Sequence, residues 1–83
     1  MTKLELKLIE LGYEIGYLSA YHKRFNNVIF LTIENYEEKG IFGSVYSERR
    51  DFIFQEHIDN LQQAFNQLQI DLKELKEYEQ IDK

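Results

Sequence analysis

The last third of the chain holds the pattern that most constrains its fold. From Glu56 to about Glu79 there is no Gly or Pro, and large apolar residues recur at alternating spacings of three and four. These residues are Ile58, Leu61, Phe65, Leu68, Leu72 and Leu75. Such spacing places one apolar seam along one side of an α-helix, as in a coiled coil. The sequence therefore predicts a long amphipathic C-terminal helix.

The seam suggests a use for this helix beyond its own fold. The apolar seam occupies about two positions in every seven, whereas a helix packed on its own sheet usually has about three apolar positions in seven. At ~1.5 Å per residue the helix is about 36 Å long, more than the ~15–20 Å width of a small sheet. We therefore interpret the six residues as a candidate interaction surface, most simply for a second copy. A plain core helix and docking to a different protein are the alternatives.

The start of the chain predicts a short helix followed by a stop. Within Thr2–Leu11 three leucines recur at spacings of four and three, which is the period of a helix. Thr2 and Glu5 have the spacing of a capping box. Gly12 is suited to the C-terminal stop because glycine takes positive φ without steric cost.

The middle of the chain predicts strands joined by short turns. Period-two patterns cover residues 13–21, 28–34 and 41–47, and polar turns cover 22–27 and 35–40. Phe52–Phe54 reads as a short fourth strand, with the start of the last helix as the alternative. Strands joined this closely pair antiparallel. We expect one α+β domain over residues 1–83: a short N-terminal helix, a meander of three or four strands, and the long C-terminal helix.

The predicted sheet is apolar on both faces, which leaves two arrangements. Both helices can cover one face and leave aromatic residues exposed on the other, or each helix can cover one face. Exposed aromatic patches often mark binding surfaces. Basic residues in the predicted turns 22–27 and 47–51 could hold a phosphate or an acidic partner if both turns lie at the same edge of the sheet. The candidate secondary surface is therefore Tyr13, Tyr17, Tyr21, Lys23, Arg24, Arg49 and Arg50.

Composition excludes several classes of function. The 15 acidic and 10 basic residues give a net charge of −5, whereas a duplex nucleic-acid binder carries a basic face. With no Cys and only two His, neither a thiolate nor a His-rich metal site is expected. No glycine-rich phosphate loop, nucleophile elbow or metalloprotease signature occurs. We expect no enzymatic activity, no cofactor, no metal and no small-molecule ligand.

We expect neither a signal peptide nor a membrane-spanning segment. Acidic residues interrupt the first positions, and the longest apolar run, Val28–Leu31, falls far short of the ~20 residues of a membrane span. We expect a cytoplasmic protein. The residue types with AT-rich codons, which are Phe, Tyr, Met, Ile, Asn and Lys, total 34. Gly, Ala, Arg and Pro together total nine. This skew indicates an AT-rich genome, such as that of a Gram-positive bacterium or its phage.

The order helix, three strands, helix is similar to that of the double-stranded RNA-binding domain. That family grips RNA with a basic cluster at the start of its last helix. Here the corresponding start reads Gln55-Glu56-His57-Ile58-Asp59-Asn60 and holds no Lys or Arg. The resemblance is confined to the order of elements, and no residue is carried across from it.

These observations predict a small protein-binding module. It would self-associate through its C-terminal helix, with a dimer favoured, and it would suit a phage or mobile-element inhibitor or adaptor. The alternative is a nucleic-acid-binding protein that uses the Tyr-rich sheet face and the basic turns.

Overall fold

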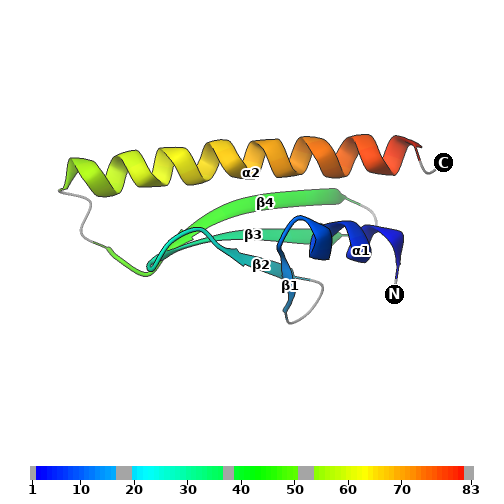
Figure 1. The fold of residues 1–83 in the computed structure, drawn as a ribbon, viewed down its shortest axis with the longest axis horizontal. Coiled ribbons are helices and arrows are strands. Elements are labelled where there is room, and N and C mark those ends of the chain that lie inside the picture. The colour runs from blue at the N-terminus through cyan, green and yellow to red at the C-terminus, as the bar shows by residue number, and fades with distance from the viewer. Residues whose placement is uncertain (1, 17–19, 37–38, 51–53, 82–83) are drawn as a thin grey trace.

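A computed structural model describes residues 2–16, 20–36, 39–50 and 54–81. The strands form one antiparallel sheet in the order β1-β2-β3-β4, and a long helix lies over one of its faces (Figure 1). The elements are α1 (Lys3–Glu10), β1 (Glu14–Ile15), β2 (Ala20–Arg24), β3 (Ile29–Tyr36), β4 (Gly40–Ser47) and α2 (Gln55–Ile81). The predicted α+β class, with its meander between two helices, is confirmed.

The short helix α1 begins and ends where the sequence predicts. The Thr2 hydroxyl oxygen accepts a hydrogen bond from the Glu5 backbone N–H at 3.1 Å, which satisfies one of the free donors of the first turn. Gly12 follows the helix with a φ of 101°, a value that favours glycine. Leu8 is fully buried, so α1 is held by its apolar side.

The first predicted strand is wrong in its boundaries. Instead of one strand over residues 13–21, the structure has β1 and β2, and β2 continues to Arg24 through part of the predicted turn. Tyr21 pairs with Ile33 and Lys23 with Leu31. The ladder to β3 satisfies the backbone of these residues whatever the polarity of their side chains.

The predicted strand at Phe52–Phe54 lies mostly outside the described residues. Of its three members only Phe54 is described, and it precedes α2 without belonging to a strand. The fourth strand of the sheet therefore arises from the division of the first predicted strand.

Alternate residues of β3 build the core beneath α2. Ile29, Leu31 and Ile33 are fully buried. On β4, Gly43 lies opposite Ile33. A Cβ atom at Gly43 would lie 2.9 Å from a Cδ atom of both Leu68 and Leu72, so the missing side chain lets α2 approach the sheet closely.

We expect Gly43→Val to destabilise the domain by about 1–3 kcal/mol, because the added side chain overpacks this contact. The neighbouring change Ser44→Val places the same side chain on the exposed opposite face and should cost less than about 0.5 kcal/mol. Urea denaturation followed by circular dichroism measures both. Equal effects of the two changes would contradict the close helix–sheet contact.

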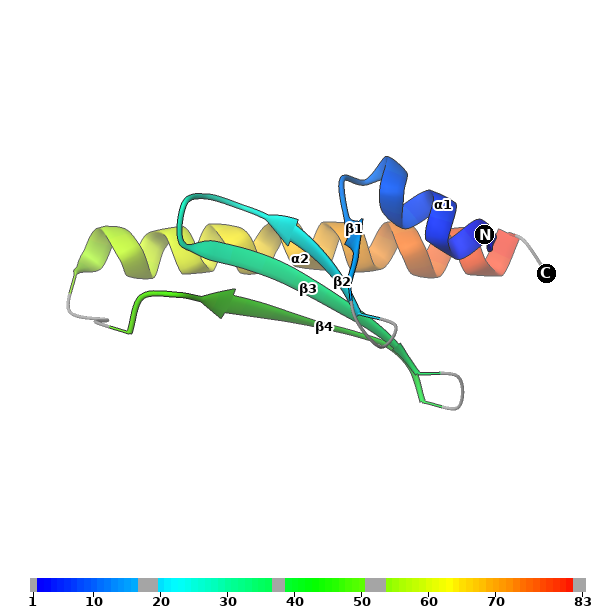
Figure 2. The same ribbon diagram turned by 90° about the horizontal axis from the view of Figure 1, so that it is seen from below.

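The helix α2 packs along its own domain instead of projecting from it. The helix is longer than a small sheet is wide, but α2 runs obliquely along the strands and on past α1 (Figure 2). Its buried side chains extend from His57 to Leu75. The molecule is correspondingly elongated, at 45 × 23 × 23 Å. Neither described helix combines the length and the apolarity needed to cross a lipid bilayer.

Candidate interaction surfaces

The structure divides the predicted helix seam into a buried and an exposed part. Leu61 packs partly buried against the core, while Ile58 and Phe65 stay 41% and 49% exposed. The other three members lie in the domain's own core: Leu68, Leu72 and Leu75. A partner can therefore reach only part of the six-residue surface.

The face that α2 turns to the sheet is wider than the seam. Ala64 is fully buried, and the polar residues His57 and Asp71 are each only 2% exposed. Because His57 and Asp71 are polar, they do not belong to the apolar pattern, which is therefore narrower than the buried stripe. The plain core helix, one of the two alternatives above, describes most of α2.

The opposite side of the sheet carries no helix among the described residues (Figure 1). Side chains alternate between the faces of a strand, so the neighbours of the buried β3 residues point away from α2. Tyr36, Phe42 and Tyr46 are 48%, 51% and 55% exposed. We call this surface the open face; it consists of His22, Arg24, Phe30, Thr32, Glu34, Tyr36, Phe42, Ser44 and Tyr46.

Aromatic pairs lie at both ends of the open face. The rings of Phe30 and Tyr46 have centroids 6.4 Å apart, and those of Tyr36 and Phe42 are 5.7 Å apart with an interplanar angle of 62°. The Arg24 guanidinium lies 4.4 Å from the centre of the Phe30 ring. At about 100 Å² for each half-exposed ring, three rings expose roughly 300 Å². That area is at the scale of the largest apolar patch on a typical monomer.

The tyrosines proposed for the secondary surface lie on the other side of the sheet. Tyr13 and Tyr21 are 2% and 6% exposed, because the register places Tyr21 on the same face as buried Ile33. Tyr17 lies outside the described residues. The aromatic side chains that are exposed come instead from β3 and β4.

Three of the four basic members of that surface lie at the same end of the sheet. β2 and β4 run in the same direction, so Arg24 at the end of β2 lies at the same end as Arg49 and Arg50 after β4. Arg24 also donates to the carbonyl oxygens of Asn26 and Asn27, at 3.3 and 3.0 Å. Lys23 is not part of this group, because it points into the layer beneath α2.

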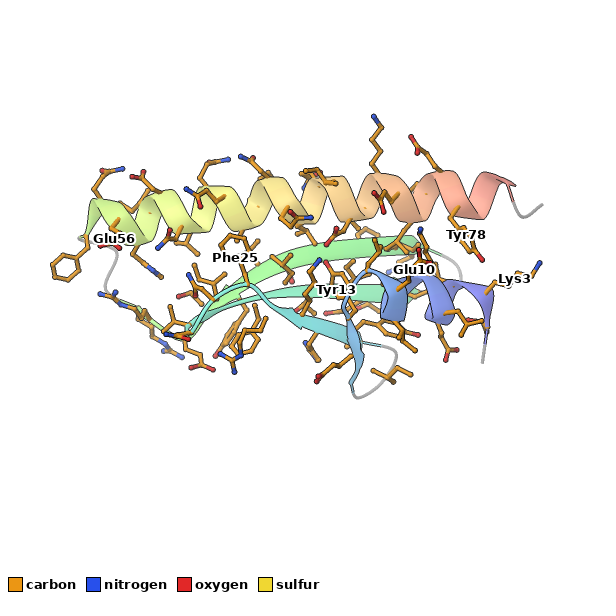
Figure 3. The ribbon with its side chains drawn as sticks, in the orientation of Figure 1. Lys3, Glu10, Tyr13, Phe25, Glu56 and Tyr78 are labelled. Carbon is orange, nitrogen blue, oxygen red and sulfur yellow. The ribbon has the colours of Figure 1, made fainter. Side chains whose placement is uncertain are left out.

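A buried polar network, which the sequence pattern did not reveal, joins the sheet to α2. The Asp71 carboxylate accepts hydrogen bonds from the Tyr13 hydroxyl at 2.7 Å, from Lys23 Nζ at 3.0 Å and from Gln67 Nε2 at 3.0 Å. Figure 3 shows Tyr13 between the strands and the helix. The Lys23 ammonium also lies 5.1 Å from the centre of the Tyr13 ring. Every buried side-chain nitrogen and oxygen atom of this cluster has a hydrogen-bond partner, so the cluster ties α2 to β2 and to the segment between α1 and β1.

This network makes stability depend on pH in the alkaline range. Burial, and then the hydrogen bond to Asp71, raise the pKa of Tyr13 above its ordinary value of 10.0. The unfolded chain therefore loses this proton first. The contribution to stability is complete below pH 10 and falls as pH rises above it, by up to about 1.4 kcal/mol per pH unit. We expect Tyr13→Phe to remove this part of the alkaline slope in urea denaturation, and an unchanged slope would contradict it.

A second polar contact fixes the start of α2 to the end of β4. Ser47 Oγ lies 3.1 Å from His57 Nε2, donates to the Arg49 carbonyl oxygen at 3.0 Å and accepts from the Arg49 N–H at 3.1 Å. These contacts fix the orientation of the chain between the end of β4 and the start of α2.

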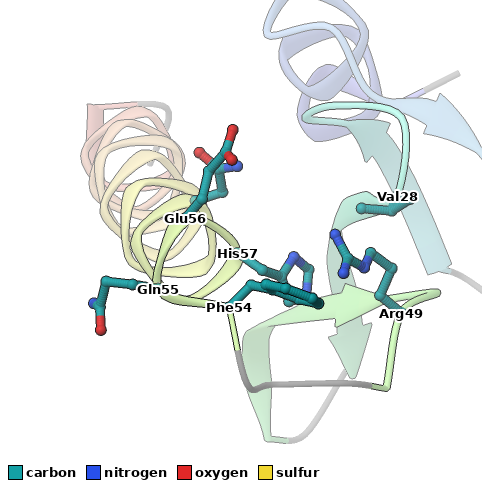
Figure 4. Close-up of a pocket in the computed structure, with 7 residues that line it drawn as sticks. Val28, Arg49, Phe54, Gln55, Glu56 and His57 are labelled. Carbon is teal, nitrogen blue, oxygen red and sulfur yellow. The ribbon is translucent and has the colours of Figure 1, made fainter.

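An open pocket of about 420 Å³ lies beside this contact (Figure 4). His57, Phe54 and Arg49 line it, and the Arg49 guanidinium lies 5.4 Å from the centre of the Phe54 ring. In the part of the chain that the structure describes, no three His, Cys, Asp or Glu side chains gather closely enough to hold a metal ion.

Comparison with protein families, with curated proteins and with solved structures gave no match to this chain.

Proposed function

We propose that the chain is a small protein-binding module that docks another protein on its open face. The observation that carries this proposal is the set of half-exposed rings on the side of the sheet opposite α2. Tyr and Phe are enriched in the cores of protein interfaces, where they supply large contact areas. The small hydroxyl side chains of Thr32 and Ser44 lie between the two aromatic pairs and leave room for a partner's side chains.

The charges of the open face favour a protein over a nucleic acid. The open face carries one Arg, Arg24, and one Glu, Glu34, and the Glu34 carboxylate accepts a hydrogen bond from the Tyr36 hydroxyl. An aromatic face of mixed charge suits a protein surface. A cytoplasmic inhibitor or adaptor from a phage or a Gram-positive bacterium fits the residue usage, and the absence of Cys fits a reducing compartment.

The test compares capture of cellular protein by matched variants of the tagged chain. Phe30→Ser with Tyr36→Ser alters the open face on the central strand β3. Ile70→Ser changes an exposed apolar residue, 53% exposed, on α2. A protein retained by the wild type and by Ile70→Ser, but lost from the β3 variant with its fold intact by circular dichroism, supports docking at the open face. Equal retention by all three chains rejects it.

A second candidate function is binding of single-stranded nucleic acid. The observation in its favour is that Arg24 lies on the open face beside Phe30, at the same end of the sheet as Arg49 and Arg50, which line the groove on the α2 side. Bases stack on aromatic side chains while basic groups follow the phosphates. The test is a titration with labelled single- and double-stranded oligonucleotides at low and moderate salt. Absence of binding at low salt excludes it, because electrostatic affinity is largest there.

A further inference from the structure

We infer that β4 is a pairing edge whose occupant is β4 of a second copy of this chain, running antiparallel. β4 is the last strand of the order β1-β2-β3-β4, and the described residues supply no strand on its outer side. An edge strand presents a row of unpaired backbone N–H and C=O groups. This contact concerns the edge of the sheet and does not depend on docking at the open face.

The two edges of the sheet are built differently. The edge strand β1 is only two residues long and includes Glu14. β4 extends over eight residues, Gly40–Ser47, without a charged residue or a proline. Native sheets protect their edges with short strands, charges and prolines. β1 has such protection and β4 lacks it, as expected for a strand that is covered by another strand.

Exposed apolar side chains flank this edge on both faces of the sheet. On the α2 side, half-exposed Phe65 lies with Leu61 and Val45 along a groove of about 510 Å³. On the open face, Phe42 and Tyr46 of β4 itself are half exposed. A strand added to β4 would cover part of both sets, because its own side chains alternate between the two faces.

β4 is complementary to itself when two copies meet around Ser44. In an antiparallel pair with its two-fold axis at that residue, Phe42 of one copy faces Tyr46 of the other, and the same pair occurs again across the axis. Aromatic cross-strand pairs stabilise antiparallel sheets. No like charges face each other within the paired strands, because β4 carries none. The two sheets join into one, with both α2 helices on the same side.

The size of the contact predicts how tightly it forms. Eight residues at ~3.3 Å each give an edge of about 26 Å. Such an edge buries less than the roughly 1,600 Å² of a standard protein interface. We therefore expect a dimer with a micromolar dissociation constant, visible as a mass that rises with protein concentration.

Sedimentation equilibrium of a matched pair of variants tests this assembly. Ser44 and Thr32 are register partners on adjacent strands and share the open face, but only Ser44 lies at the edge. In Ser44→Lys two ammonium groups meet at the axis, so we expect the dimer to weaken by about tenfold or more. Thr32→Lys should leave the dimer unchanged.

A cross-link provides a second measurement that does not depend on weakening the dimer. The chain contains no cysteine, so Ser44→Cys can form a disulfide only with another copy. Opposed residues of an antiparallel pair have Cα atoms about 4.5–5.5 Å apart, a separation that a disulfide spans. We expect rapid oxidation of Ser44→Cys to a covalent dimer and slow oxidation of Thr32→Cys.

Two results would overturn the inference. One is a wild-type chain that stays monomeric up to millimolar concentration, together with equal oxidation rates for the two cysteine variants. The other is a dimer that Thr32→Lys dissociates and Ser44→Lys does not, which would place the contact between open faces.

Discussion

Leu68→Asp is expected to unfold the domain at 25 °C. Leu68 lies on the side of α2 that faces the sheet and is 1% exposed, and its side chain packs against Gly43. The change removes a core side chain, which costs about 2–5 kcal/mol, and buries an unpaired carboxylate, which costs several more. A chain of 83 residues has roughly 4–12 kcal/mol of total stability. Loss of the helical signal at 222 nm in the absence of urea is the measurement.

Phe65→Asp is the control for this change, because both positions belong to the same apolar seam. Phe65 is 49% exposed, so its replacement should cost only about 1 kcal/mol and leave the domain folded. If both variants stay folded, α2 does not pack on the sheet as the structure has it. If both variants unfold, the Phe65 side chain is buried in the domain and not half exposed as the structure has it.

The elements themselves could be predicted because local signals agree with the tertiary contacts. Thr2 and Gly12 mark the two ends of α1, and an uninterrupted period marks α2. The division between β1 and β2 could not be predicted, since the alternation continues through residues 13–21 without a break. Pairing with β3 decides where β2 lies, and a single segment carries no information about its partner's register.

The surfaces were harder to predict than the elements, for the same reason. Tyr21 and Tyr46 have the same side chain and both lie in strands, yet one is buried and the other is 55% exposed. Which face each tyrosine takes depends on where α2 lies, and period-two alternation fits both choices. Asp71 was missed because a carboxylate on an amphipathic helix is ordinarily assigned to solvent. Its partners Tyr13 and Lys23 are 58 and 48 residues away.

Asp71→Ala is expected to destabilise the domain by about 3–5 kcal/mol. The change leaves the Tyr13 hydroxyl buried without an acceptor and the Lys23 ammonium, 23% exposed, without its counter-charge. Removal of one partner of a buried ion pair costs this much because the remaining charge stays desolvated. The midpoint of urea denaturation at pH 7 measures it, relative to the wild type at the same protein concentration.

Asp59→Ala is the matched control on the same helix. Asp59 also accepts a hydrogen bond from the Gln four residues before it, Gln55, at 2.9 Å, but it is exposed. Its loss should cost less than about 1 kcal/mol. A triple variant, Tyr13→Phe with Lys23→Met and Asp71→Leu, removes the polar groups together and should recover most of the stability lost in Asp71→Ala. If the triple variant is as unstable as Asp71→Ala, the packing of Asp71, and not its charge, stabilises this layer.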